Sequence, residues 1–250
     1  MWLPPPHALS LGPGDVHVWC ITLDMLPVPL DLLTSVLAKS ERERLQRYRS
    51  KEAATEFLAS RGILRVLLGK YLGIDPRSVR LNFGPAGKPR LDEVAHHESV
   101  RFNISHAAGV CLLAFASRRE VGVDLEVLKP AMDLTDLIPA VLSPTEEAEF
   151  WLLPEHLHSY AFLCAWTRKE AVLKALGEGL SVCPNAVEVS MDAQYPKLLR
   201  LPKHSTVEWR LLHLEPVEGY VGAVASEGSN YDLSCWRWSN PDTSTDRYGM

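Results

Sequence analysis

Two acids on an apolar segment are the first residues that could carry chemistry. Asp124 and Glu126 lie two positions apart in Val121–Val127 (VGVDLEV), so a strand would point both carboxylates to one face and its valine and leucine side chains to the other. Carboxylates on a buried strand are costly unless a cation meets them, and Mg²⁺ prefers such hard oxygen ligands. A solvated edge strand with outward acids accounts for the same pair, and on this pair alone we favour it.

A third acid lies on a helix predicted from Phe162 to Leu180 (FLCAWTRKEAVLKALGEGL). Helical spacing places Trp166, Glu170 and Lys174 on one side, at i, i+4 and i+8. An amphipathic helix with a Glu–Lys surface pair explains this helix equally well. Taken with the acids of the strand, however, three carboxylates and a lysine suit a site that holds a metal and a pyrophosphate.

Several other residues could hold phosphate groups. Ser105 and His106 follow a strand-like FNI and can donate hydrogen bonds, and Arg61 lies in a helix otherwise rich in Leu and Ala. Lys88 is held on a stiff turn between Gly87 and Pro89. Each has a plainer explanation: His106 as a structural histidine and Lys88 as part of a surface loop. The basic run 42–51, which contains Arg44, is most simply a solvated helix face. Neither a G-x-G-x-x-G nor a G-x-x-x-x-G-K-[ST] motif occurs, so these two nucleotide sites are not supported.

The elements that must position these residues fall into two related halves. We predict strands over 15–24, 79–83, 110–116, 121–127, 186–191, 207–214, 220–226 and 233–238, and helices over 30–38, 57–73 and 162–180, with further helix starts capped by Ser40 and Ser143 and a turn at Asn103. Four short segments recur in the same order about a hundred residues apart, for example VHVWC at Val16 and VGVDL at Val121.

The repeat predicts an irregular lead-in (1–14), an N-terminal half (15–118), a C-terminal half (119–238) and a flexible tail (239–250). The expected fold class is α+β (α/β), with two pseudo-two-fold-related halves, each a small antiparallel-rich sheet packed with helices. In this alignment Trp19 corresponds to Asp124, and Arg65 corresponds to Glu170. The halves would therefore share a scaffold and differ in chemistry.

Composition narrows the classes of function. The 250 residues are 46% hydrophobic and 23% charged, as in globular proteins, and a net charge of −5 argues against a nucleic-acid partner. Five scattered cysteines without C-x-x-C spacing favour a reducing cytoplasm over a disulfide framework or a zinc site. The proline-rich first residues do not resemble a signal peptide, and no apolar run is long enough to span a membrane.

The motifs together resemble the 4′-phosphopantetheinyl transferases of the surfactin-synthetase-activating type. GKP at Gly87, FNISH at Phe102, VGVDLE at Val121 and WTRKEAVLKALGEGL at Trp166 follow that family's pattern in order and at suitable spacing. The resemblance is firm over about residues 40–190. It implies duplicated α/β halves with an active site at their junction.

The resemblance also implies substrates and residue roles. The enzyme would move the phosphopantetheine arm of coenzyme A onto a serine of an acyl or peptidyl carrier protein and release adenosine 3′,5′-bisphosphate. Asp124, Glu126 and Glu170 would hold Mg²⁺ (or Mn²⁺), Glu170 or a metal-bound water would deprotonate the serine, and Lys174 would stabilise the leaving phosphate. The nucleotide would contact a further set of residues: Arg61, the weaker candidate Arg44, Lys88, Pro89, Ser105, His106 and Lys174.

The carrier protein supplies the nucleophile, so no catalytic Ser or Cys motif is needed in this chain. Since carriers are typically acidic, a chain of negative net charge must meet them through a local patch. The candidate docking segment comprises Leu128, Lys129, Pro130, Met132, Leu134 and Leu137, although an ordinary helix core explains it equally well. We expect a monomer. The alternatives are a catalytically silent binding module for coenzyme A or carriers and a Mg²⁺-dependent hydrolase of the coenzyme A pyrophosphate.

Overall fold

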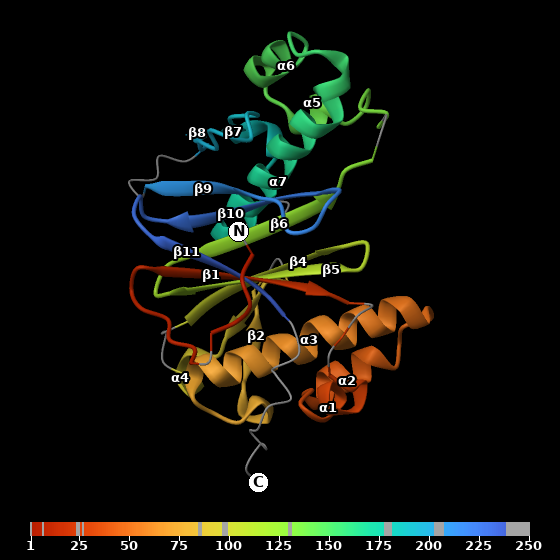
Figure 1. The fold of residues 1–250 in the computed structure, drawn as a ribbon, viewed down its shortest axis with the longest axis vertical. Coiled ribbons are helices and arrows are strands. Elements are labelled where there is room, and N and C mark those ends of the chain that lie inside the picture. Colours follow the sequence, from red (N-terminus) through yellow and green to blue (C-terminus); the bar gives the residue numbers. More distant parts are fainter. Residues whose placement is uncertain are drawn as a thin grey trace.

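The fold is built from four layers, with two sheets stacked between helices (Figure 1). A computed structural model describes residues 2–6, 8–23, 26, 28–84, 87–96, 100–129, 132–177, 182–202 and 208–238. The predicted tail 239–250, the candidate docking residue Pro130, the start of the strand predicted over 207–214 and the end of the helix predicted to reach Leu180 lie outside these residues.

The first half supplies one sheet and the helices on its outer face. Its elements are β1 (Asp15–Thr22), α1 (Leu30–Ser35), α2 (Lys39–Leu45), α3 (Lys51–Leu72), η1 (Pro76–Ser78), β2 (Leu81–Phe83), β3 (Pro89–Leu91), α4 (Glu93–His96), β4 (Val100–Ala107) and β5 (Val110–Ser117).

The second half supplies the other sheet and a long helix. Its elements are β6 (Val121–Val127), α5 (Ile138–Val141), α6 (Pro144–Phe150), η2 (Glu155–Leu157), α7 (His158–Leu176), η4 (Pro184–Ala186), β7 (Glu188–Val189), β8 (Leu198–Arg200), β9 (Trp209–Leu214), β10 (Tyr220–Glu227) and β11 (Asp232–Arg237).

The predicted repeat is present in the sheets. The first sheet has the order β11-β1-β5-β4 and the second the order β6-β10-β9. The antiparallel set β1-β5-β4 therefore corresponds to β6-β10-β9, and the long helices α3 and α7 correspond to each other. This confirms the predicted α+β fold with two halves, each a sheet packed with helices.

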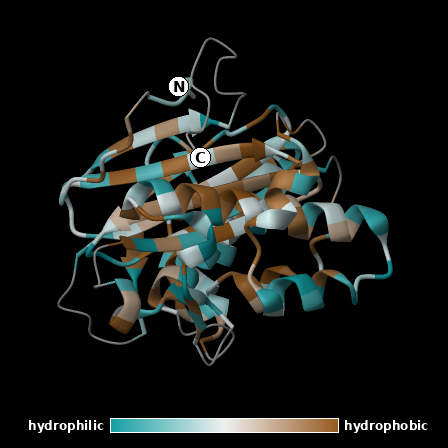
Figure 2. Cartoon of the chain, turned by 90° about the horizontal axis from the view of Figure 1, so that it is seen from below, coloured by the Kyte–Doolittle hydropathy of each residue, from teal (hydrophilic) through white to brown (hydrophobic). Residues whose placement is uncertain are grey.

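Apolar residues fill the three spaces between the layers. One cluster lies between the first sheet and α1–α3, a second between the second sheet and α7, and a third between the two sheets. Figure 2 shows that the strands are largely hydrophobic, whereas hydrophilic residues lie on the outer helix surfaces. On β6, Val121, Val123 and Leu125 join the cluster between the sheets. The opposite face of β6, which carries Asp124, is thereby turned toward α7.

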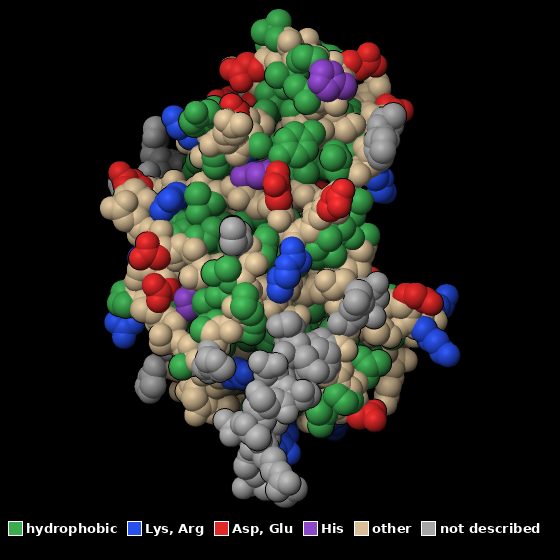
Figure 3. Space-filling view, viewed as in Figure 1, with side chains coloured by type: hydrophobic (Ala, Val, Ile, Leu, Met, Phe, Trp, Pro, Cys, Tyr) green, Lys and Arg blue, Asp and Glu red, His purple; other side chains and the backbone are tan. Residues whose placement is uncertain are grey.

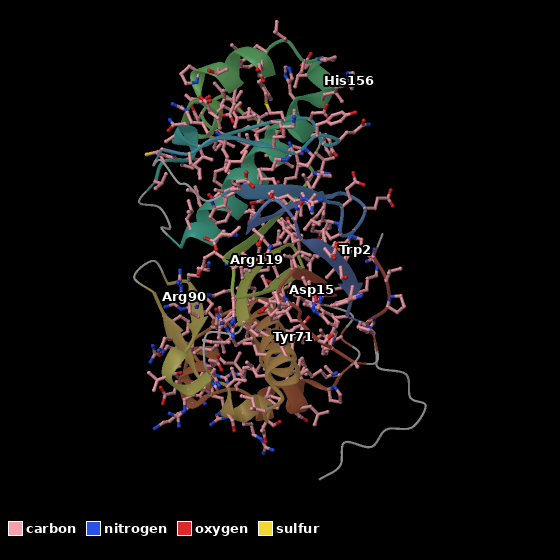
Figure 4. The ribbon with its side chains drawn as sticks, turned by 90° about the vertical axis from the view of Figure 1, so that its left-hand side faces the viewer. Trp2, Asp15, Tyr71, Arg90, Arg119 and His156 are labelled. Atoms are coloured by element: carbon pink, nitrogen blue, oxygen red, sulfur yellow. The ribbon has the colours of Figure 1, made fainter. Side chains whose placement is uncertain are left out.

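The end of the described chain returns to the first half. β11 pairs in parallel with β1, in the register Val16↔Leu233. The connection between the halves is fastened to this return by Arg119, which lies between the two halves in Figure 4. Its guanidinium donates to the carbonyl oxygens of Pro13, Glu227 and Asn230. The boundaries given above for the two halves stay predictions.

Of the two predicted N-caps of helices, one is confirmed and one is wrong. Ser143 caps α6 as predicted, and Glu146 completes a capping box there. The predicted cap Ser40 is wrong, because Ala38 is the N-cap of α2. The side chain of Glu41, the third residue of the helix, accepts a hydrogen bond from the Ala38 amide at 2.8 Å, which is the glutamate's half of a capping box.

The two long helices begin earlier than predicted and end at glycines. α3 begins at Lys51 and α7 at His158, several residues before the predicted starts. Gly73 and Gly177 adopt left-handed conformations (φ of 66° and 73°) and donate backbone hydrogen bonds to the last turns, as glycine permits.

Gly122 is where α7 approaches β6 most closely. A Cβ atom on this residue would lie 1.9 Å from the carbonyl oxygen of Ala171 and 2.5 Å from the amide nitrogen of Ala175. No side chain other than hydrogen fits, so the absence of a side chain at this position of β6 sets the distance between strand and helix.

We expect Gly122→Ala to separate α7 from β6 and to lower the free energy of unfolding by at least about 2 kcal/mol, because the added carbon meets backbone that cannot rotate away. Urea unfolding followed by circular dichroism measures the change. Gly14→Ala is the matched control, since nothing lies within 4 Å of its added Cβ. Equal unfolding midpoints for the two variants would contradict this role of Gly122.

Candidate active site

The centre of the candidate site joins the two halves. Asp124 on β6 is buried, and its Oδ1 accepts hydrogen bonds from Lys174 Nζ at 2.5 Å and from Ser105 Oγ at 2.8 Å. The Lys174 amine also donates to Ser105 Oγ at 3.0 Å. Ser105 comes from β4 of the first half, whereas Asp124 and Lys174 come from β6 and α7 of the second. Three residues predicted from the sequence thus form one hydrogen-bonded cluster.

Glu126 and Glu170 belong to the same region and are half-buried. Burial raises the pKa of the Glu126 carboxyl against the effect of a hydrogen bond from Trp166, whose Nε1 lies 3.2 Å from Glu126 Oε1. Burial, and next the charge of Asp124, raise the pKa of Glu170. The three acids therefore repel one another in a partly desolvated space.

The chemistry of this donor set fits a divalent cation. Asp124 Oδ2 is buried and has no hydrogen-bond partner, and such an oxygen is costly unless a cation or donor meets it. A cation would also relieve the repulsion that raises the pKa of Glu126 and Glu170. As they stand, no three Asp, Glu, His or Cys side chains of the described residues converge closely enough to hold a metal ion.

A pocket of about 310 Å³ opens beside the cluster, on the side of the first half. It is lined by Arg44, Tyr48, Ala53, Glu56, Phe57, Ser60, Arg61, Ile104, Ser105, His106 and Lys174. Five of the residues predicted to contact a nucleotide line it, and cationic side chains outnumber acids. The pocket is therefore suited to a polyanion. Lys174 lines the pocket and also contacts Asp124, so it connects the pocket to the acids.

Arg61 is the most deeply buried cation of the pocket, with 9% of its surface exposed. Burial lowers its pKa, and the charge of Glu41, whose Oε1 lies 3.8 Å from Arg61 Nε, opposes that effect. Its Nη1 is buried without a hydrogen-bond partner. A buried guanidinium with an unused donor at a pocket wall is suited to an anion.

Lys88 and Pro89 do not line this pocket. The Lys88 amine donates to Glu120 Oε2 at 3.1 Å and to the carbonyl oxygen of Ala175, at the end of α7, at 2.9 Å. Burial lowers the pKa of this amine. Pro89 is buried as the first residue of β3. The side chain of Lys88 thus holds its turn against the end of α7.

Arg65, which corresponds to Glu170 in the repeat, does not face the pocket. It is 2% exposed, and its Nε donates to Glu41 Oε2 at 2.5 Å while its Nη1 donates to the carbonyl oxygens of Pro76 and Val79. All of its described contacts are internal to the first half. Arg61, one turn earlier on α3, therefore lines the pocket, whereas Arg65 does not.

Comparison with known proteins identifies the family. Residues 27–118 match the family described as 4′-phosphopantetheinyl transferase, N-terminal, and residues 120–225 match the 4′-phosphopantetheinyl transferase superfamily. The chain is 35% identical over 237 residues, 95% of this chain and 98% of the relative, to the 4′-phosphopantetheinyl transferase HetI of Nostoc sp.. The chain belongs to the 4′-phosphopantetheinyl transferase superfamily. It is an enzyme that transfers phosphopantetheine from coenzyme A to carrier proteins.

Other phosphopantetheinyl transferases are similar over shorter stretches. The chain is 25% identical to the 4′-phosphopantetheinyl transferase Sfp of Bacillus subtilis over 77% of this chain and 83% of the relative. It is 30% identical to the L-aminoadipate-semialdehyde dehydrogenase-phosphopantetheinyl transferase of Schizosaccharomyces pombe over 74% of each chain. Enzymes of this family typically use Mg²⁺ and coenzyme A.

The transferase positions its acids with a residue for which the sequence predicted a different role. Asn103, predicted as a turn former, lies within β4, and its Oδ1 accepts a hydrogen bond from the amide of Val123 at 2.9 Å. This contact joins the edge of the first sheet to β6 next to Asp124. The strand-like FNISH segment contains the relevant signal, because a buried polar residue in a strand needs a partner.

Glu120 is a second residue that sequence reasoning missed. Besides Lys88, its carboxylate meets Arg90 Nη1 at 3.5 Å and Arg101 Nε at 3.4 Å. It lies in the connection between the halves, so these ion pairs help to fix the first half of the transferase against the second. In the sequence, Glu120 follows Arg118 and Arg119 in a charged segment, and nothing in that segment predicts that three cations far along the chain contact its carboxylate.

The candidate docking segment is divided between core and surface. Leu134 is buried in the cluster between α7 and its sheet, and Leu128 and Met132 pack against that cluster. Lys129 and Leu137 are exposed. Further apolar side chains of this end of the transferase, Trp151 and Leu152, are also exposed, and Figure 3 shows hydrophobic side chains at the corresponding upper part of the molecule. Among the described residues, no helix is long and apolar enough to cross a membrane.

We expect Glu170→Gln to raise the melting temperature of the metal-free transferase at pH 7.5 by roughly 2 °C or more. The pKa of Glu170 is raised in the folded state, so folding is opposed once pH exceeds the ordinary value of 4.5, and the full cost is present above the folded pKa. The difference between variant and wild type should therefore shrink as pH falls toward 4. Thermal unfolding in a chelator measures it.

Glu149→Gln, on an exposed position of α6, is the matched control for this prediction. A variant at Glu170 that is no more stable than the wild type at pH 7.5, or a difference that does not change with pH, would contradict the repulsion between the three acids.

Proposed function

We propose that this enzyme carries out phosphopantetheinyl transfer at the Asp124 cluster while the pocket lined by Arg44, Arg61 and His106 holds the nucleotide of coenzyme A. One observation carries the proposal: Lys174 lines the cationic pocket and is hydrogen-bonded to Asp124, the most buried of the three acids of the site. A single side chain thus lies where the nucleotide end of the substrate would meet its pyrophosphate.

The reaction is a displacement at phosphorus. The hydroxyl oxygen of the carrier serine forms a bond to the phosphorus that bears the pantetheine arm, the bond from that phosphorus to the bridging oxygen breaks, and adenosine 3′,5′-bisphosphate leaves. The serine proton must be taken by a base. Glu170 suits this role because its pKa is raised, which brings a carboxylate closer to the pH at which it works.

Lys174 suits the leaving group. Its ammonium would donate to the phosphate on which negative charge accumulates as the bridging bond breaks. Asp124 holds this amine in place, and Ser105 shares both contacts, so the donor is oriented before the substrate arrives. Positioning and neutralisation of charge supply most of the catalysis in reactions of this class.

Asp124, Glu126 and Glu170 would hold Mg²⁺, and Mn²⁺ has the same preference for oxygen ligands. Bound there, the ion supplies neutralisation of the pyrophosphate charge. Trp166 fixes one oxygen of Glu126, and the free Oδ2 of Asp124 is available as a ligand. Glu170 reaches the same region from the helix.

The remaining contacts hold the nucleotide. Arg44 and Arg61 would bind the 3′-phosphate, and Ser105 and His106 the phosphates nearer to Lys174. Lys88 and Pro89 would act through the turn that they stabilise against α7, because the Lys88 amine is committed to Glu120 and Ala175.

The protein partner would be an acyl, peptidyl or polyketide carrier protein. Lys129, an exposed residue of the docking segment, lies two residues after the end of β6, the strand that carries Asp124 and Glu126, and Leu137 is exposed farther along the chain. We propose that a monomer is sufficient, since the two halves that meet at the site are on one chain. All five cysteines are free, which suits a reducing cytoplasm.

We expect Asp124→Asn to lower kcat/KM for carrier modification by at least about 100-fold, because the variant keeps its shape and loses the charge that binds a metal and orients Lys174. Intact-mass measurement of an apo-carrier incubated with coenzyme A and Mg²⁺ follows the reaction. Asp31→Asn, at an exposed position of α1, should leave the rate unchanged. Full activity of Asp124→Asn would contradict the assignment.

The same assay tests the function itself. The wild-type protein should add one phosphopantetheine arm to at least one of several apo-carriers and should not consume coenzyme A without a carrier. Consumption of coenzyme A in the absence of any carrier would instead indicate a hydrolase.

A further inference from the structure

Phe57 holds an unusual position in the pocket, because two guanidinium groups lie over its ring. The Cζ of Arg44 is 4.9 Å from the ring centroid, and the Cζ of Arg61 is 5.8 Å from it. Both distances are within the range of a cation–π contact. The ring is buried and lines the pocket together with both arginines. It packs against Tyr48, with the two ring centroids 5.2 Å apart.

Two cations that share one ring repel each other. The charge of Arg44 is among the causes that lower the pKa of Arg61, after burial. Glu41 offsets part of this repulsion, although its shortest contact is with Arg65 rather than with Arg61. The negative face of the Phe57 ring supplies attraction to both cations at once without an acid that would compete for an anion.

The pair of guanidiniums matches a phosphate monoester in charge and in the donors it offers. Such a group carries nearly two negative charges at neutral pH, and a guanidinium donates to phosphate through two parallel hydrogen bonds. The unpartnered Nη1 of Arg61 provides a donor for it. Lys174 lies on α7 of the other half, so the pocket has a separate cation for the pyrophosphate end.

We propose that Phe57 is a positioning residue whose ring holds Arg44 and Arg61 together to receive the 3′-phosphate, and that it thereby determines selectivity for coenzyme A over dephospho-coenzyme A. This rests on the proposed function and adds to it the residue that prepares the two arginines. An ordinary packing role for Phe57 would depend on the volume of the ring, whereas the proposed role depends on the charge distribution of its face.

Stepwise fluorination separates these roles, because it removes the negative face of the ring and changes its shape little. Phe57 is replaced in the full-length chain by phenylalanines with one, three and five ring fluorines. We expect the ratio of kcat/KM for coenzyme A to that for dephospho-coenzyme A to fall at each step, by about 10-fold at the last. The rate with dephospho-coenzyme A should stay constant. A ratio unaffected by fluorination overturns the inference.

Binding without turnover gives a second readout. The affinity for adenosine 3′,5′-bisphosphate, measured by calorimetry, should fall along the series, while that for adenosine 5′-monophosphate should not. Phe57→Tyr should keep the selectivity and Phe57→Leu should lose it. The same fluorinated series at Phe102, a buried ring that packs on Phe115 in the first-half core, should leave the ratio unchanged.

The outcomes distinguish the two proposals. Transfer by the wild-type chain with a ratio that fluorination does not change overturns the role of Phe57 and leaves the proposed function intact. A chain that transfers no arm from either substrate overturns the proposed function and this inference together. Equal wild-type rates with both substrates overturn the assignment of the 3′-phosphate to the two arginines, and with it the role of Phe57.

Discussion

The direct packing of α7 on β6 is the constraint on which the site depends. Gly122 lets the helix backbone approach the strand, and the next residue on the same face of the strand is Asp124, followed by Glu126. Two residues of a strand advance about 6.6 Å, and four residues of a helix advance about 6 Å. The contacts do not follow this spacing strictly, because Lys174 and Trp166, eight residues apart on the helix, bond to acids two positions apart on the strand. Lys174 reaches Asp124, Trp166 reaches Glu126, and Glu170 lies between them on the helix.

In the first half, the corresponding helix does not pack directly on its strand. By the repeat, its strand β1 has His17 where β6 has Gly122, and Trp19 where β6 has Asp124. Both rings are buried, and both bond to the hydroxyl of Tyr71 near the end of α3. Bulky rings between strand and helix leave no room for a close approach. The same scaffold thus provides a filled core in one half and a polar site in the other.

Besides their sheets and long helices, the two halves share an ion pair at the start of a short helix. In each half, a glutamate that accepts a hydrogen bond from the N-cap amide of a short helix also receives a buried cation from the long helix. Glu41 receives Arg65, and Glu146 receives Lys169 at 2.5 Å. Removing one member of such a pair would leave a buried charge, so these cations are bound to the fold and are not available to substrates.

The sequence was sufficient where local pattern determines structure. Alternation in VGVDLEV and spacing by four in WTRKEAVLK place Asp124 and Lys174 on facing surfaces, and the structure joins them. It was insufficient where a partner lies far along the chain. Asn103 bonds to a backbone amide twenty positions away and Lys88 bonds to Ala175, and neither contact leaves a trace in local spacing. The cap at Ala38 was missed because alanine has no side-chain acceptor and its amide donates to Glu41, three residues later.

The charges around the site are separated in a way that gives the substrate a direction. Arg44, Arg61 and His106 line one side, and Asp124, Glu126 and Glu170 lie beyond Lys174 on the other. Under the proposed assignment, a phosphate at the nucleotide end of the ligand is attracted to the cations and repelled by the acids, and the pyrophosphate would lie near Lys174. The uncharged pantetheine arm would then extend past the acids. The proposed orientation of the substrate thus rests on this local separation of charge, although the chain as a whole carries a net charge of −5.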